Sequence, residues 1–293
     1  MNAPTTMPTH AAIQTQWSKP LTPKEWDELF PGILDAIPAI GGAANVVMQL
    51  ARPGVGYGVM ESKVDSGNIF KNPLKRARTT FTYLAVAMLG TTEEKLAYRK
   101  AVNRSHAQVK STESSPVQYR AFDPDLQLWV AACLFWGLLD GMTKFRSTPT
   151  PETMQKLLHY VEPLATTLQV RPEMWPKTMT EFETYWENEL NKVHIDDAVR
   201  GFLTAIVDLK FLHPVIRNTL GPLHRFMTAG FLPEKIRNEM QLEWGPKQQR
   251  AFDRIILIAA ALNRALPRFV RQAPLAAVMW DFRRRYKKQL PLV

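Results

Sequence analysis

Hydrophobic residues recur at intervals of three and four along most of this chain. One such series runs from Phe81 to Met88 and another from Phe252 to Ala259. Residues at these intervals share one face of a helix, so the pattern predicts amphipathic helices. Alternating strand patterns bounded by hairpin turns are scarce, which favours an all-α fold. The expected helices cover 24–35, 40–51, 73–89, 92–109, 124–143, 151–168, 179–191, 194–209, 215–229, 233–241, 247–265 and 275–288.

Helix starts are marked by short polar signals. Thr91 stands three residues before Glu94, the spacing of a reciprocal capping box, and Thr180 with Glu183 repeats it. Asp123 precedes a proline, and proline is tolerated at the first position of a helix. These signals predict helices that begin near residues 92, 124 and 180.

Two stretches interrupt the helical pattern. Residues 52–58 are rich in glycine and are expected to form a connection, although they lack the lysine and the spacing of a phosphate-binding loop. Residues 110–123 are expected to form a polar loop. No Pro/Gly-rich linker divides the rest of the chain. We therefore expect a flexible N-terminal tail over 1–20 and a single multi-helix globular domain over 21–293.

Composition allows a large core and shows a basic balance. The chain has 293 residues, of which 45% are hydrophobic, and a formal net charge of +10. Eight of its basic residues lie between Arg264 and Lys288, where Asp281 is the lone acid. Such a cluster can contact phosphates of lipid or nucleic acid, although a solvated helix face is the more ordinary alternative. Aromatic–basic signatures of nucleic-acid modules are absent, so no nucleic-acid partner is expected.

The cysteine and histidine content excludes several kinds of site. Cys133 is the single cysteine, so no intramolecular disulfide or cysteine-based zinc site is expected. None of the six histidines forms a His-x-x-x-His pair. The apolar runs 128–139 and 255–262 are shorter than the roughly 18–20 residues that span a bilayer. With no signal peptide, we expect a cytoplasmic protein and leave peripheral membrane contact open.

The most informative residues lie in two consecutive predicted helices. Arg76 and Thr80 are four residues apart and share a face, with Tyr83 one turn further on. His106 follows in the next helix. A cation, a hydroxyl and an imidazole could line a haem pocket, because haem needs one axial protein ligand, apolar walls and cations for its propionates. Two ordinary packed helices would also explain the pattern.

Several segments, in the same order, have the pattern of a known catalytic domain. They are 46–53, which contains Leu50-Ala-Arg-Pro53, then 73–80, 106–109, 119–130, 230–237, 242–244 and 266–267. Together, over about residues 40–275, they resemble the domain shared by bacterial rubber oxygenase (latex clearing protein) and the fungal ER-bound oxygenase of mycophenolic acid biosynthesis. The resemblance implies an all-helical fold and, in the rubber oxygenase branch, haem b held by one histidine.

The resemblance also implies roles for particular residues. His106 matches the proximal iron ligand, and Arg76 and Thr80 match an arginine and a threonine on the distal side. A cation and a hydroxyl can hydrogen-bond dioxygen as negative charge develops on it. Glu61 falls near a family acid proposed as a general base. Thr79 would lie beside the haem, where the rubber oxygenase branch has a lysine that can occupy the distal iron position.

Two further departures from the family pattern concern catalysis. Ala131 stands where many relatives have a second histidine, and Ser111 replaces a family glycine. The resulting prediction is a haem-dependent oxidoreductase, an oxygenase that uses dioxygen on an apolar, isoprenoid-like substrate. Aromatic residues such as Trp129, Phe135 and Trp136 could contact that substrate or simply fill the core. The alternative prediction is a non-enzymatic helical module that docks the basic segment 282–288 on a membrane or anionic partner.

Overall fold

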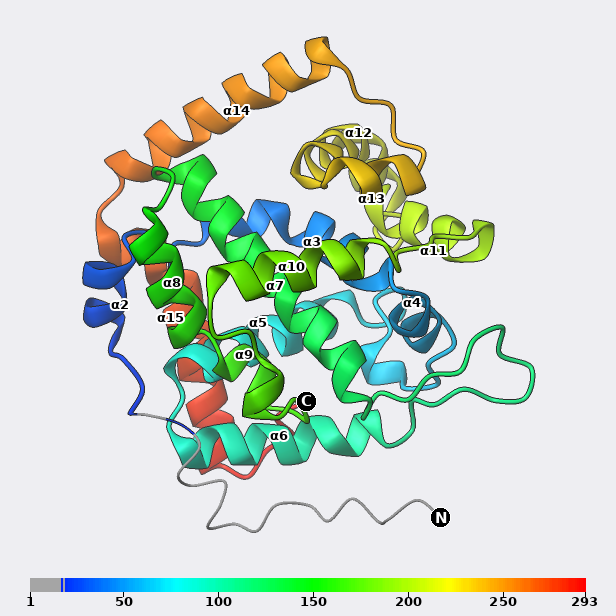
Figure 1. Cartoon of the computed structure of the whole chain (residues 1–293), viewed down its shortest axis with the longest axis horizontal. Helices are drawn as coiled ribbons and strands as arrows, with labels where there is room; N and C mark the ends of the chain where they lie inside the picture. The colour runs from blue at the N-terminus through cyan, green and yellow to red at the C-terminus, as the bar shows by residue number, and fades with distance from the viewer. Residues whose placement is uncertain (1–16, 18) are drawn as a thin grey trace.

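The computed structural model describes residue 17 and residues 19–293, and over this range it is a single helical domain without β-strands (Figure 1). One isolated bridge joins Lys110 and Arg120. The helices are α2 (Pro23–Leu29), η1 (Ile37–Gly41), α3 (Gly42–Leu50), α4 (Pro53–Met60), η2 (Asp65–Gly67), α5 (Pro73–Leu89), α6 (Thr92–His106), α7 (Pro124–Phe145), α8 (Pro151–Tyr160), α9 (Pro163–Thr166), η3 (Pro172–Met174), α10 (Met179–Leu190), α11 (Asp197–Val207), α12 (Pro214–Phe231), α13 (Glu234–Glu239), α14 (Pro246–Ala265) and α15 (Arg268–Lys287).

Most of the expected tail, residues 1–20, lies outside the described residues. Within it, Trp17 is buried and its indole N–H donates a hydrogen bond to the Thr166 hydroxyl over 2.9 Å. The Lys95 ammonium lies 5.5 Å from the centre of the same ring. Trp17 therefore packs against α6 and α9.

Helix α7 runs through the middle of the molecule, and α3, α9 and α14 pack against it (Figure 1). The Asp123 carboxylate accepts hydrogen bonds from the first amides of α7, as the sequence predicts. Among the described residues, α7 is the one helix long and apolar enough to cross a membrane, because the apolar run 128–139 belongs to a helix of 22 residues. Protein surrounds it, and 44% of its most apolar stretch is buried.

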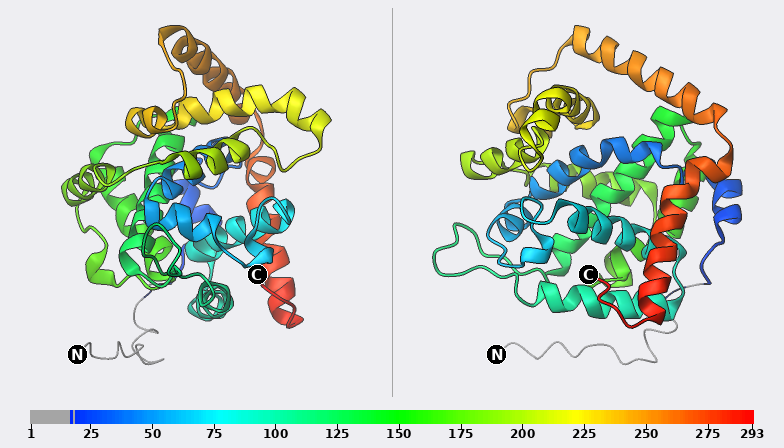
Figure 2. Two further views of the ribbon diagram at one scale, coloured as in Figure 1. Left: turned by 90° about the vertical axis from the view of Figure 1, so that its right-hand side faces the viewer. Right: turned by 180° about the vertical axis from the view of Figure 1, so that it is seen from behind.

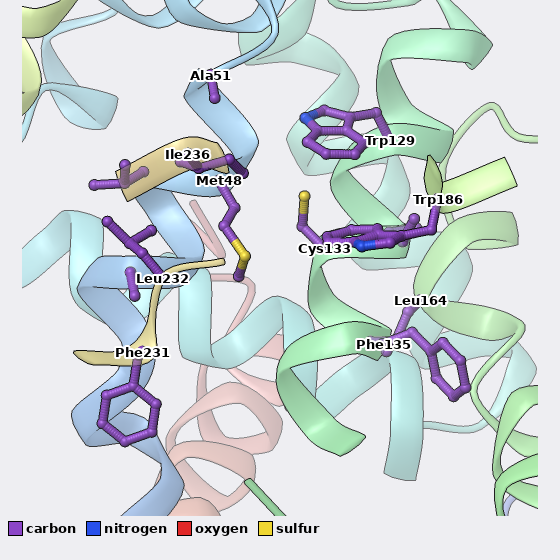
Figure 3. Packing of buried hydrophobic residues seen from close by; sticks show 14 of the residues in the cluster. Met48, Ala51, Trp129, Cys133, Phe135, Leu164, Trp186, Phe231, Leu232 and Ile236 are labelled. Atoms are coloured by element: carbon purple, nitrogen blue, oxygen red, sulfur yellow. The ribbon is translucent and has the colours of Figure 1, made fainter. Parts of the chain in front are cut away.

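Aromatic side chains of α7 and α10 stack against one another in the core. Trp186 stacks against Trp129 at 5.2 Å and against Trp136 at 5.7 Å between ring centres. Figure 3 shows Trp129 and Trp186 beside each other, with Met48 of α3 across from Cys133. Trp129 and Phe135 are completely buried. The packing gives these two residues a core role.

The glycine-rich stretch 52–58 is a helix, α4, and not the connection that its composition predicts. Arg52 is extended and Pro53 occupies the first helical position, where its missing N–H costs nothing. A Cβ on Gly56 would lie 2.6 Å from the Leu50 carbonyl oxygen, and one on Gly54 would lie 3.0 Å from Leu126. Close packing therefore requires glycine at these positions. The high glycine content predicts a flexible connection, but here the glycines lie in a helix.

Other helix boundaries also differ from the predicted ones. The N-cap of α10 is Thr178 rather than Thr180, since the Thr178 hydroxyl accepts from the Glu181 amide. The predicted helix 151–168 is divided at Pro163 into α8 and α9. Helix α15 begins at Arg268, seven residues before the expected start, and holds Pro274 within it.

Helix α15 packs along α5 more extensively than any other helix does (Figure 2, right). Met279 and Phe282 of α15 enclose a second small core with Ala85 and Tyr98. The Arg283 guanidinium donates to both carboxylate oxygens of Glu94 on α6, at 2.7 and 3.2 Å. The C-terminal helix therefore holds α5 and α6 in place.

Candidate active site

Apart from Glu61, the predicted site residues lie on α5 and α6, and a buried hydrogen bond joins these two helices. The Thr91 capping box with Glu94 starts α6 as predicted. The Tyr98 hydroxyl donates to the Thr79 carbonyl oxygen over 2.7 Å. The Tyr83 hydroxyl donates to the Leu164 carbonyl oxygen over 2.5 Å, which attaches α5 to α9. This framework fixes where the side chains between the two helices can point.

His106, the last residue of α6, is half-buried and has an unsatisfied nitrogen. Its Nδ1 is buried and has no hydrogen-bond partner among the described residues. Burial lowers the pKa of His106 to about 4, and the positive charge of Arg76 contributes in the same direction. The imidazole is therefore neutral at pH 7 and keeps a lone pair for a metal. Its ring meets Phe122 edge-on at 6.4 Å.

Arg76 lies near enough to His106 to lower its pKa, so the structure brings these two predicted residues together. Burial lowers the pKa of the Arg76 guanidinium, which is half-buried. Among the described residues its side chain forms no ion pair and donates no hydrogen bond. Withdrawing a guanidinium even partly from water without an acceptor costs free energy, and a ligand could supply that acceptor.

Like Arg76 on α5, Arg99 on α6 is a half-buried cation. It is not among the site residues predicted from the sequence. Burial lowers its pKa, and no described carboxylate forms an ion pair with it. It stands seven residues before His106, so two helical turns place both side chains on one face. That spacing could have identified Arg99 from the sequence.

The two predicted threonines use their hydroxyl protons within α5. The Thr79 and Thr80 hydroxyls each donate to the Arg76 carbonyl oxygen over 3.0 Å. A hydroxyl has one proton, so Thr80 presents only lone pairs to a neighbour in this rotamer. Thr80 can donate to a ligand only after its side chain rotates and gives up this bond. Thr79 is buried.

Glu61 belongs to a different cluster. It caps the C-terminal end of α4, and its Oε2 accepts hydrogen bonds from the Ser115 and Tyr119 hydroxyls, both over 2.6 Å. Burial and then the bond to Glu61 raise the pKa of Tyr119 to about 12. Among the described residues, no hydrogen bond or ion pair joins Glu61 to Arg76, Thr80 or His106.

The donor set suits a haem better than a metal ion bound by several side chains. Within residues 17 and 19–293, no group of three or more His, Cys, Asp or Glu side chains could hold an ion. A haem needs one neutral imidazole and cations for its propionates. His106 supplies the imidazole with an orphan nitrogen, and Arg76 and Arg99 supply cations without described carboxylate partners. The residues present therefore fit the group.

Comparison with known proteins places the chain among oxygenase catalytic domains. It belongs to the family described as ER-bound oxygenase mpaB/B'/rubber oxygenase, catalytic domain, which matches residues 33–261. This range covers α5 and α6, whereas α15 lies beyond it. The family supports an oxygenase-type enzyme that acts on a small molecule with oxygen.

Two bacterial relatives are similar over most of their length. The chain is 45% identical over 241 residues to uncharacterized protein Rv2237 of Mycobacterium tuberculosis and to uncharacterized protein Mb2261 of Mycobacterium bovis. Each alignment covers 82% of this chain and 94% of the relative. No solved structure matches the chain.

Proposed function

We propose that this protein is a haem-dependent oxygenase that acts on an apolar, isoprenoid-like substrate. The observation that carries the proposal is the neutral, half-buried imidazole of His106, whose buried Nδ1 lacks a partner beside the cation of Arg76. Membership of an oxygenase family supports the same reaction class. An apolar substrate of this kind partitions into membranes, so a cytoplasmic protein with peripheral membrane contact is the matching location.

His106 would bind the iron of haem b, and Arg99 would pair with a propionate. When bound, haem supplies a redox-active iron that can activate dioxygen. Burial suits His106 to the ligand role, because a pKa of about 4 leaves its lone pair available across the physiological pH range. Arg99 keeps its proton at any such pH, so it can neutralise a carboxylate.

Arg76 and Thr80 would orient dioxygen. The Arg76 guanidinium has five N–H donors and no described acceptor, so it can hold negative charge as it develops on oxygen. Thr80 would accept a hydrogen bond in its present rotamer and donate one after rotation. Thr79 keeps its hydroxyl on the helix backbone and has no amine that could reach the iron.

Only one of the two carboxylate oxygens of Glu61 would be free to act as a general base. Both of its hydrogen bonds end on Oε2, which leaves Oε1 to take a proton. The substrate would therefore have to reach Glu61 from the side away from Ser115 and Tyr119. This role depends on substrate binding between α4 and the 110–123 loop.

The alternative prediction, a binding module with a basic C-terminal face, has less support. Arg283 pairs with Glu94, while Arg284 and Arg285 pair with Asp281. The five cations of the segment 282–288 therefore share two acidic partners within the fold, and Lys287 and Lys288 form no ion pair with a described residue. The oxygenase proposal explains the unsatisfied groups between α5 and α6, and the alternative does not.

An isotope experiment tests the proposed reaction. The haem-loaded protein is incubated with a long-chain isoprenoid under heavy dioxygen, and the products are analysed by mass spectrometry. We expect heavy oxygen in a shortened or hydroxylated isoprenoid. The Arg76→Gln variant should lose at least about tenfold in rate, since one charged donor to a developing anion is worth about 2–4 kcal/mol. Unchanged substrate with fully haem-loaded protein would contradict the proposed reaction.

A further inference from the structure

The outer face of α14 exposes large apolar side chains in a helical stripe. Ile255, Ile258 and Leu262 are spaced by three and four residues and are 37%, 60% and 65% exposed. Leu266, 46% exposed, and Phe269, 76% exposed, extend the surface into the start of α15. We call these five residues the α14 stripe. Isolated exposed apolar residues are ordinary, whereas a contiguous group usually marks an interaction site.

The α14 stripe is not the core-facing side of the helix. Phe252, Ile256 and Asn263 of α14 are buried and pack inward, where α14 meets α7 and α12. Helix α14 therefore has two apolar faces, and one of them is not covered by described protein. Helix α12 lies at the same end of the molecule in both figures and also exposes Ile216, Leu220 and Leu223 (Figures 1 and 2).

Exposed arginines of α14 lie on one side of the α14 stripe, with Arg254 four residues before Ile258 and Arg250 one turn earlier. Arg250, Arg254 and Arg264 are exposed on α14 and form no ion pair with any described residue. Asp253 is the single acid of this helix, and Gln249 donates a hydrogen bond to it. Exposed arginines beside large apolar residues are typical of helices that lie in a membrane interface, where the cations meet anionic headgroups.

Charge also distinguishes between possible occupants of this face. A second copy of the chain has the same net charge of +10 and would bring the same arginines together. An anionic bilayer attracts these arginines and accepts the apolar side chains between its headgroups. Of the two occupants, the charge distribution favours the bilayer.

We propose that the outer face of α14 is a docking surface for anionic membranes. Ile258, Leu262 and Phe269 would enter the headgroup region, while Arg250 and Arg254 would contact lipid phosphates. This surface differs from the basic segment 282–288, whose three arginines have acidic partners within the fold. The inference stands independently of haem binding, because none of its residues touches the candidate active site.

Vesicle sedimentation tests this surface directly. The full-length protein is mixed with vesicles of phosphatidylcholine alone, or with one third phosphatidylglycerol, and the bound fraction is measured at low and high salt. We expect binding to the anionic vesicles that weakens as salt screens the arginines. The double variant Ile258→Asn/Leu262→Asn should bind at least about tenfold less tightly, because two large side chains no longer leave water.

A matched control separates this surface from other exposed apolar residues. Trp280 on α15 is 66% exposed, about as much as Leu262, and Trp280→Asn should leave vesicle binding unchanged. Circular dichroism confirms that each variant is folded. Lack of binding by the unaltered protein, or equal loss in both variants, would overturn the proposal. A dimer in light scattering that Ile258→Asn/Leu262→Asn dissociates would also overturn it, in favour of a second copy.

Discussion

The α5–α6 pair and the α14 stripe show opposite departures from ordinary globular structure. Between α5 and α6, the buried His106 Nδ1 and the half-buried Arg76 guanidinium have no described hydrogen-bond partner. On α14, apolar groups such as Leu262 are exposed to water without a covering helix. The first departure indicates a ligand inside the fold, and the second indicates a partner outside it.

The largest expected effect on stability comes from removing the support of the α5–α6 pair. Phe282→Ala deletes a side chain that is 1% exposed and whose ring centre lies 5.9 Å from the ring centre of Tyr98. We expect a loss of about 3–5 kcal/mol in the free energy of unfolding, as for other buried aromatic residues. Urea denaturation measures it. A loss below 1 kcal/mol would mean that α15 does not hold α5 and α6.

Removing the Asp35 carboxylate, which binds Asn263 of α14, should lower the free energy of unfolding by a similar or smaller amount. Asp35 Oδ2 accepts hydrogen bonds from Arg146, Asn263 and Arg271, each over 2.7 Å. Asp35→Ala leaves two largely buried guanidinium groups without their carboxylate, which costs about 3 kcal/mol. Asp65→Ala, at the exposed pair with Lys71, serves as control and should cost less than about 1 kcal/mol. Equal midpoints for the two variants in thermal unfolding would contradict this ordering.

The haem-free protein should lose stability in acid because of His106. The pKa of His106 is about 4 in the folded chain against 6.5 ordinarily, so the unfolded chain binds the proton first. This difference contributes nothing at pH 7 and destabilises the fold as the pH falls from 6.5 toward 4. Between pH 7 and pH 5 the loss is about 2 kcal/mol.

The control for this pH effect is a side chain that does not titrate. His106→Gln should retain about 2 kcal/mol more of its pH 7 stability at pH 5 than the unaltered chain does. Urea midpoints at the two pH values provide the comparison, and other titrating groups cancel in the difference. Parallel pH profiles would show that His106 titrates normally.

The smallest effect on stability belongs to the α14 stripe. Leu262→Asn changes a side chain that is 65% exposed, so the free energy of unfolding should change by less than about 0.5 kcal/mol. A loss of 2 kcal/mol or more in urea denaturation would show that Leu262 is covered in solution. The contrast between an exposed Leu262 and a buried Phe282 would then be wrong, because both side chains would be packed against protein.

The sequence predicts elements well where local signals and packing agree. Helix α5 matches its expected range of 73–89, and Thr91 caps α6 as expected. Helix α4 was missed because its glycines serve contacts with Leu50 and Leu126, and such contacts do not appear in a local pattern. The start of α15 was missed because Pro274, usually a helix breaker, lies inside it.

Part of the candidate site also follows from local sequence patterns. Two consecutive helices predict that Arg76 and His106 lie on facing surfaces, and the positive charge of Arg76 is close enough to contribute to the lowered pKa of His106. The Thr80 rotamer depends on competition between the backbone and a ligand, which no spacing reveals. The partners of Glu61 come from the 110–123 loop, which folds back through the bridge between Lys110 and Arg120.

The central claim, that His106 ligates haem, is tested most directly by optical spectroscopy. The protein is expressed with ample haem supply, and its ultraviolet–visible spectrum is recorded before and after reduction with dithionite and addition of carbon monoxide. We predict a Soret band that shifts on reduction, is lost in His106→Ala, and is kept in the control His159→Ala, whose side chain is exposed. An undiminished Soret band in His106→Ala, or none in the unaltered protein, would contradict the assignment.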